Sequence, residues 1–220
     1  MDLSIQALIM GLVQGLTEFI PVSSSGHLVL VPWLFGWTDP FINSVAFTVI
    51  LHMGTLVALL AFFWRDWVTL IPAGLAAIRD RSLKGDPNRK MAFLLVVATI
   101  PAVLVGPIFE SKLEDLVREP ARIALMLCVG AAILWLADRW GSRQRDETSL
   151  TFRETLGIGV AQVVALVPGI SRSGISISAG LFRVSPWIRT LAMVSSQILA
   201  AGLIAVKSGK SAPARKFFFT

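Results

Sequence analysis

The feature that most limits the fold of this chain is a run of nineteen residues, 91–109, that holds no charged side chain. A helix of this length can cross the hydrocarbon layer of a bilayer, which is about 30 Å thick. Further apolar runs cover 44–64, 123–137 and 190–206. Because lipid offers the backbone no hydrogen-bond partners, runs of this kind fold as helices. With 55% hydrophobic residues and a mean hydropathy of +0.72, the sequence predicts an all-α polytopic membrane protein.

The loops between these runs indicate how the chain crosses the membrane. Five Lys and Arg residues fall within 79–90 and four within 139–153, whereas 110–119 has two against four acids. The positive-inside rule therefore predicts that both basic loops are cytoplasmic and that 110–119 is outside. The segment 67–78 contains Pro72, and we expect it to be interfacial or to enter only half of the membrane. Since the basic residues lie in short loops, the net charge of +6 does not indicate nucleic-acid binding.

One apolar stretch, 11–30, carries side chains that are costly at membrane depth. It holds Gln14, Glu18, three consecutive serines and His27. Ionisable groups inside a membrane segment indicate a functional site by default. Gln14 and Glu18 are four residues apart and so share one face of a helix.

The same stretch is interrupted between two short helices. Pro21 removes a backbone donor and is expected to end the first helix. The serines and Gly26 then precede a second apolar run from Leu28. Free N–H groups and hydroxyls at such a helix start favour an anion-binding site.

This pattern recurs 148 positions later. Alignment of Gly26 with Gly174 also pairs Gln14 with Gln162, and it pairs Gly11, Ser23 and Ser25 with Gly159, Ser171 and Ser173. Arg172 stands where the first copy has Ser24, and Leu166 where it has Glu18. Paired interrupted segments are typical of membrane proteins with inverted-topology repeats and a site between them. We interpret the two copies as two halves of one pocket.

The repeat predicts the organisation of the whole chain. The segments 3–22, 28–37, 156–167 and 175–182 are interpreted as broken or re-entrant helices. Three crossings lie between the two copies, so the second copy should enter the membrane inverted. We expect one membrane domain over 1–206, with repeat one at about 3–64, repeat two at about 154–206 and a basic tail at 207–220.

Two further polar groups stay ambiguous from the sequence. His52 lies in the apolar run 44–64, where it could hydrogen-bond between helices or take part in a site. The matched Gln14 and Gln162 have the same two interpretations.

In its two polar motifs the sequence resembles the bacterial undecaprenyl-diphosphate phosphatase family, membrane enzymes linked to bacitracin resistance. One family signature, Glu/Gln-x-x-x-Glu running into P-V-S-S-[ST]-G-H, is matched by Gln14, Glu18, Pro21, Ser23, Ser24, Ser25, Gly26 and His27. The other, P-G-x-S-R-S-G-x-[ST], is matched by Pro168, Gly169, Ser171, Arg172, Ser173, Gly174 and Ser176. The likeness covers roughly residues 1 to 185 and includes L-H-x-G-T at 51–55 and T-I-P-A at 99–102.

The resemblance implies hydrolysis of undecaprenyl diphosphate to undecaprenyl phosphate and phosphate, which recycles the lipid carrier for cell-wall synthesis. Glu18, with Gln14, would hold a divalent cation (Mg²⁺ or Ca²⁺) or position water. His27 would act as general acid–base or nucleophile, with Ser24 as the rival nucleophile. Arg172 would stabilise phosphate charge, and the phosphates would also contact Ser23, Ser25, Gly26, Ser171, Ser173, Gly174 and Ser176.

The same resemblance implies a multi-pass protein of the bacterial inner membrane. Its expected partners are the polyprenyl diphosphate substrate and membrane lipids, without nucleic acid, and a homodimer stays an open alternative. Family members continue through further membrane helices, whereas this sequence ends in KSGKSAPARKFFFT, so we expect a shortened chain. The alternative functions are a carrier that translocates a lipid phosphate or an ion, and an inactive truncated remnant.

Overall fold

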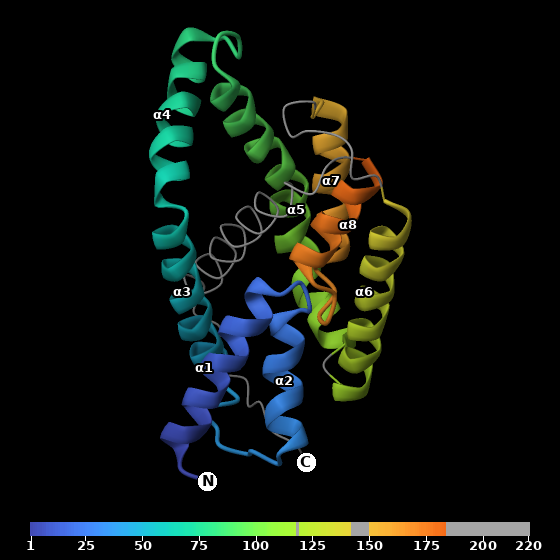
Figure 1. Cartoon of the computed structure of the whole chain (residues 1–220). Coiled ribbons are helices and arrows are strands. Elements are labelled where there is room, and N and C mark those ends of the chain that lie inside the picture. Colours follow the sequence, from blue (N-terminus) through green and yellow to red (C-terminus); the bar gives the residue numbers. More distant parts are fainter. Residues whose placement is uncertain (118, 142–149, 184–220) are drawn as a thin grey trace.

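The computed structural model describes residues 1–117, 119–141 and 150–183, and every element in that part of the chain is a helix (Figure 1). The elements are α1 (Leu3–Phe19), α2 (Ser24–Leu34), α3 (Val45–Phe62), α4 (Trp64–Asp80), α5 (Pro87–Val117), α6 (Pro120–Trp140), α7 (Phe152–Val164) and α8 (Arg172–Arg183). The prediction of an all-α chain is confirmed.

Two short helical hairpins enter the bundle from opposite ends (Figure 1). In that view the first hairpin (α1, α2 and the turn 20–23) rises from the N-terminal end and returns there. The second hairpin (α7, α8 and the turn 165–171) descends from the opposite end and returns to it. Helix α8 starts at the position that the 148-residue repeat aligns with the start of α2. The predicted inverted repeats are therefore present in the fold.

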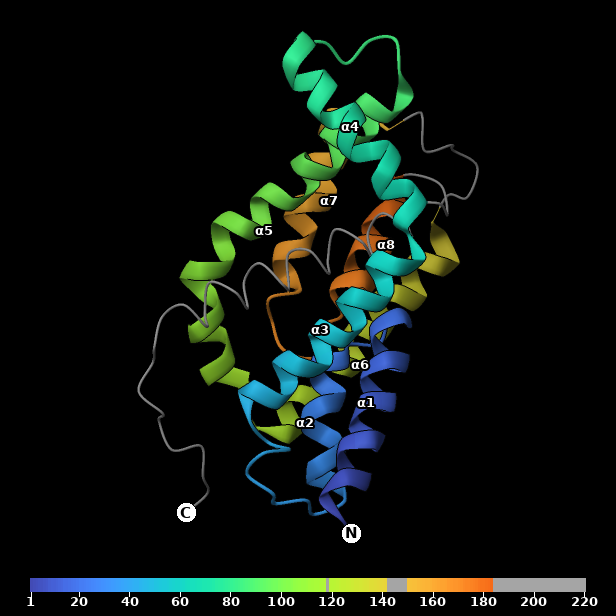
Figure 2. The ribbon, with the colours of Figure 1, turned by 90° about the vertical axis from the view of Figure 1, so that its left-hand side faces the viewer.

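Three passes of the chain connect the two hairpins (Figures 1 and 2). Helices α3 and α4 run in the same direction and are separated only by Phe63. Helix α5 returns, and α6 runs back to the end at which α7 begins. An ion pair of 2.9 Å from Arg89 of α5 to Asp80 of α4 links the two helices across the turn.

Three of these helical segments are long and apolar enough to cross a membrane: Val45–Phe62, Pro87–Phe109 and Pro120–Trp140. Their bounds match three of the predicted apolar spans to within a few residues, and the direction in which each crosses stays a prediction. The fourth predicted crossing, 190–206, lies outside the described residues. Large apolar side chains are widely exposed on these segments, as expected for lipid-facing helices.

Several predicted helix bounds were wrong by up to four residues, since the segments predicted at 156–167 and 175–182 are α7 and α8. The helix expected from Leu28 begins four residues earlier, so Ser24 to Gly26 form its first turn. The segment 67–78 was expected to be interfacial or to enter half of the membrane, and it is part of a longer helix, the 17-residue α4, which has Pro72 in its interior. How α4 sits relative to a bilayer stays a prediction, as do the domain and repeat limits.

Local sequence signals fix several helix ends near the site. Thr151 and Glu154 form a capping box at the start of α7. The hydroxyl of Ser44 accepts the N–H of Phe47 at the start of α3, 3.1 Å away. Helix α1 ends at Phe19, just before Pro21, as a following proline favours.

Apolar clusters hold each hairpin against the connecting helices. Met10, Leu28 and Phe47 join α1, α2 and α3 in one cluster. On the other side, Ile170 and Ile175 of the second hairpin pack with Met126 and Ile133 of α6. The two turns are therefore supported from outside by α3 and α6, which positions the polar residues between them.

Candidate functional site

The first turn begins with a strained residue. Ser23 has φ +68°, in the left-handed region that non-glycine residues seldom adopt. This conformation reverses the chain within the four residues that separate α1 from α2. Such outliers persist where the surrounding structure enforces them, and they are concentrated at functional sites.

The Glu18 carboxylate, at the end of α1, accepts two hydrogen bonds from the same hairpin. The Ser24 hydroxyl donates to Glu18 Oε2 in a close contact, and the Gln14 amide donates to the same oxygen over 2.9 Å. Ser24 and Gln14 are both buried, and the Glu18 side chain is only 14% exposed. Gln14 and Glu18 were predicted to lie on one face of a helix, and the hydrogen bond between their side chains confirms this.

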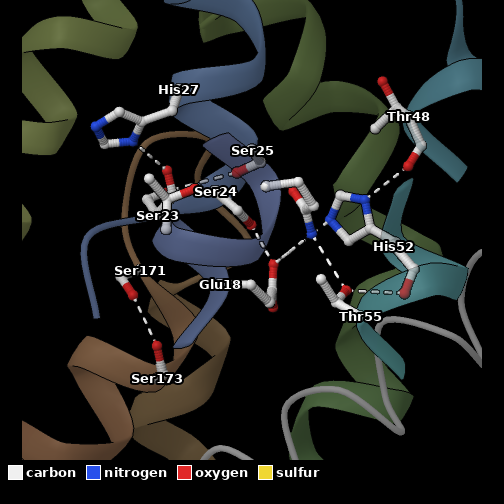
Figure 3. Close-up of polar contacts among 12 residues, drawn as sticks. Glu18, Ser23, Ser24, Ser25, His27, Thr48, His52, Thr55, Ser171 and Ser173 are labelled. Carbon is white, nitrogen blue, oxygen red and sulfur yellow. Dashed lines mark hydrogen bonds and ion pairs between the residues drawn. The ribbon is translucent and has the colours of Figure 1, made fainter. Parts of the chain in front are cut away.

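Helix α3 adds two residues to this network (Figure 3). The Gln14 amide also donates to Thr55 Oγ1 at 3.4 Å, and His52 Nε2 lies 3.9 Å from Glu18 Oε2. Thr55 was not predicted as a site residue, and His52 was left open between a site and a hydrogen bond between helices. Both residues fall in the L-H-x-G-T match at 51–55, which was their signal in the sequence.

His27 occupies a different place from the one its sequence neighbourhood suggested. Its Nδ1 lies 2.8 Å from the carbonyl oxygen of Ser23, and the side chain is half-buried. Figure 3 shows its ring on the far side of the serine turn, pointing away from Glu18. The structure therefore brings Ser24, rather than His27, into contact with the carboxylate. The catalytic role of His27 stays a prediction.

The second hairpin contributes its own group of hydroxyls. Ser171 precedes α8, and its Oγ lies 3.0 Å from Ser173 Oγ and accepts the N–H of Gly174 over 3.1 Å. Ser176 is fully buried and donates to the carbonyl oxygen of Arg172, 2.9 Å away. The phosphate-binding role predicted for Ser176 therefore requires that this internal bond be broken, and it stays a prediction like the others.

Arg172 is the first residue of α8 and is partly buried. Its position follows the serine turn of the second hairpin, as the repeat predicted. A guanidinium at a helix start adds its charge to the N–H end of the helix dipole, which favours an anion there.

The two turns touch each other through glycine. A β-carbon on Gly174 would lie 3.1 Å from the carbonyl oxygen of Pro21, and one on Gly26 would lie 3.4 Å from the α-carbon of Gly169. At Gly174 a side chain would force the neighbouring backbone to move, whereas at Gly26 it would only just touch the other turn. The Glu18 group and the Ser171–Arg172–Ser173 group are thereby held at one contact between the hairpins.

The donors around Glu18 suit a hard divalent cation better than a soft one. They comprise one carboxylate, the hydroxyls of Ser24 and Thr55, and the Gln14 carbonyl oxygen, which is buried and has no hydrogen-bond partner. Oxygen ligands of this kind are those that Mg²⁺ and Ca²⁺ prefer. In the part of the chain that the structure describes, no three His, Cys, Asp or Glu side chains are grouped as a ready-made metal cluster.

Fold and site together define an all-helical membrane protein with a polar site between two inverted hairpins. The model of the family described as "Bacitracin resistance protein BacA" matches residues 7–214. The chain belongs to this family.

Individual relatives are similar over most of this chain. An undecaprenyl-diphosphatase of Desulforudis audaxviator is 44% identical over 178 residues, which are 81% of this chain and 65% of the relative. Those of Moorella thermoacetica and Pelobacter propionicus are 43% and 44% identical over 80% of this chain and 64% of their own length. The chain thus spans somewhat less than two thirds of the length of these relatives.

Proposed function

We propose that this protein hydrolyses undecaprenyl diphosphate to undecaprenyl phosphate and inorganic phosphate. The observation that carries the proposal is the bond from the Ser24 hydroxyl to the Glu18 carboxylate, opposite a second turn that bears Arg172. A hydroxyl hydrogen-bonded to a base is the arrangement of an activated nucleophile. The names of the relatives support undecaprenyl diphosphate as the substrate.

In the proposed reaction the Ser24 oxygen attacks the terminal phosphorus while its proton passes to Glu18. A bond from Ser24 Oγ to phosphorus forms, and the bond from phosphorus to the bridging oxygen breaks, so undecaprenyl phosphate leaves. Glu18 gives this proton to the departing undecaprenyl phosphate and is a carboxylate again. Water then attacks the phosphorus of the phosphoserine, and the bond from phosphorus to Ser24 Oγ breaks. Glu18 accepts a proton from the water and returns it to Ser24 Oγ, which restores the hydroxyl. Attack by water directly, or by His27, is the alternative that the sequence left open.

Phosphoryl transfer depends mainly on positioning and on stabilisation of charge. The Arg172 guanidinium can bind phosphate oxygens through two parallel hydrogen bonds. The hydroxyls of Ser171 and Ser173, on either side of Arg172 in the sequence and 3.0 Å from each other, can donate further hydrogen bonds to the phosphate oxygens. Burial of the surrounding side chains strengthens each of these interactions.

Gln14 and Glu18 are the residues proposed to hold a divalent cation, Mg²⁺ or Ca²⁺. When bound, such an ion would neutralise phosphate charge and polarise the phosphorus–oxygen bonds. A single carboxylate among neutral oxygens predicts weak binding.

The proposed setting is the bacterial inner membrane, with several passes and with membrane lipids as neighbours. The product would return to cell-wall synthesis as a lipid carrier. A homodimer belongs to the same set of proposals.

A carrier for lipid phosphate is the second candidate, because inverted hairpins that meet in the membrane are also found in transporters.

The test is to incubate the detergent-purified full chain with undecaprenyl diphosphate and to quantify both products. Equimolar phosphate and undecaprenyl phosphate support the phosphatase. Unchanged lipid, together with its movement across the bilayer of proteoliposomes, supports the carrier. If the lipid is neither hydrolysed nor moved, the chain is an inactive remnant. A carrier needs no nucleophile, so Ser24→Ala should spare transport and abolish hydrolysis.

A further inference from the structure

His52 of α3 faces the carboxylate of Glu18, although the two residues are 34 positions apart in the sequence (Figure 3). We propose that His52 Nε2 is a ligand of the divalent cation held at Glu18, which makes this a site with nitrogen as well as oxygen donors. This inference rests on the cation of the proposed function. It adds a residue outside the serine and arginine motifs.

The hydrogen bond on the other side of the ring fixes the tautomer. His52 Nδ1 lies 2.8 Å from the carbonyl oxygen of Thr48. A carbonyl oxygen only accepts, so Nδ1 carries the proton and donates it. With Nδ1 as the donor, Nε2 is the ring nitrogen that faces Glu18 and is left to bind a cation. Histidines that bind metals usually donate their other N–H to a carbonyl or carboxylate in this way.

The facing atoms are close enough to share an ion after a small adjustment. His52 Nε2 and Glu18 Oε2 are 3.9 Å apart, too far for a direct hydrogen bond. Two neighbouring ligands that each lie about 2.1 Å from one metal ion are about 3.0–3.4 Å apart in tetrahedral or octahedral geometry. The two side chains would therefore move together by about half an ångström when the ion binds.

Neighbouring side chains hold the two ligands in place. Thr55 Oγ1 donates to the carbonyl oxygen of His52 over 2.9 Å and accepts from the amide of Gln14. The carbonyl oxygen of Gln14 is an independent indication of a missing ligand, because Gln14 is only 1% exposed and this oxygen has no hydrogen-bond partner. An unpartnered buried oxygen is costly, and a cation would remove that cost.

The nitrogen donor has a consequence for metal choice. Imidazole suits the later first-row metals such as Zn²⁺, whereas Mn²⁺, like Mg²⁺ and Ca²⁺, prefers oxygen ligands. We expect Zn²⁺ to bind more tightly than Mn²⁺, and loss of the imidazole to weaken Mn²⁺ by at least about tenfold. Mg²⁺ affinity should change less.

The two histidines of the chain allow the test to be made without ambiguity. The full chain, purified through a tag that contains no histidine and labelled with ¹⁵N-histidine, is mixed with Mn²⁺ alone and no substrate. Electron spin-echo modulation then reports whether an imidazole nitrogen is bound to the metal. The proposal expects ¹⁵N coupling in the wild type and in His27→Gln, and its loss in His52→Gln.

Coupling that disappears in His27→Gln, or absence of coupling or of Mn²⁺ binding in the wild type, would overturn the proposal. If His52→Gln does not fold, the wild type and His27→Gln still decide, because His52 is then the only histidine left. The readout is independent of catalysis. If Mn²⁺ is bound through nitrogen but no phosphate is released, the metal site is supported and the phosphatase proposal is contradicted. If phosphate is released but no nitrogen coupling is seen, the phosphatase proposal is supported and the His52 ligand is contradicted.

Discussion

Gly174 of the second hairpin packs directly against the carbonyl oxygen of Pro21 in the first hairpin, so that a β-carbon at Gly174 would lie 3.1 Å from that oxygen. The same β-carbon would lie 3.0 Å from the β-carbon of Ser171. Both neighbours belong to the turns that carry the site, and a backbone oxygen cannot move aside as a flexible side chain can. The closeness of the two hairpins therefore depends on this glycine.

Gly174→Ala is expected to destabilise the protein by about 1–3 kcal/mol, because the added methyl forces the two turns apart. The separation should also lower phosphate release, since the two groups of site residues would no longer face one another. The midpoint of thermal unfolding in detergent and the initial rate are the measurements. Gly157→Ala in α7 is the matched control: it meets open space, and alanine should stabilise that helix by up to about 1 kcal/mol. Equal stability of the two variants would show that the hairpin contact does not matter.

Ser24→Ala should reduce phosphate release by at least about a thousandfold, because it removes the proposed nucleophile. Ser25→Ala should cost only about tenfold, the value of one hydrogen bond, since Ser25 is exposed and its hydroxyl contacts Ser23 rather than Glu18. Initial rates at saturating lipid distinguish the two. Similar losses in both variants would point to water or His27 as the attacking group.

Gln14→Glu should raise the affinity for Mg²⁺ or Ca²⁺ by about tenfold, because it adds a second carboxylate beside Glu18. In the wild type the Gln14 amide donates a hydrogen bond of 2.9 Å to Glu18. In the variant two carboxylates face each other, so without the metal they should repel and lower the unfolding temperature. Metal titrations of activity and thermal unfolding with chelator measure the two effects.

Gln162→Glu provides the matched control for this variant. Gln162 is fully buried at the equivalent repeat position, but Leu166 stands where the first repeat has its acid. A charge there should destabilise the chain without creating metal affinity. A gain in metal affinity in both variants, or in neither, would contradict the assignment of the cation to the first hairpin.

Much of the architecture could be predicted from sequence because membrane segments depend on local composition. The apolar runs, the proline after α1 and the 148-residue repeat predicted the crossings and the inverted hairpins. The boundary at Ser24 was missed because serine and glycine are as common in turns as at helix starts. A proline usually ends or kinks a helix, but this rule considers only the local sequence. It does not consider contacts with neighbouring helices, and α4 continues through Pro72.

The site was harder to predict, because two of its relationships depend on tertiary packing. His52 reaches Glu18 only because α3 packs against α1 through contacts such as Phe47 with Met10. The His27 ring is held at the carbonyl oxygen of Ser23, a residue with a left-handed backbone that the sequence gives no means of anticipating at a serine. Residue types indicated where polar chemistry lies, and packing decided which groups meet.

The central claim is that one pocket, with a residue from each hairpin, hydrolyses the lipid diphosphate. Its most direct test is phosphate release from undecaprenyl diphosphate by the purified wild type, Glu18→Gln, Arg172→Gln and the double variant, each with Mg²⁺ and with chelator. We expect metal-dependent release by the wild type, a loss of at least about a hundredfold in each single variant, and a double variant little worse than either, as for residues that act as a unit. No release from folded, monodisperse wild type, or a wild-type rate in either single variant, would contradict the claim.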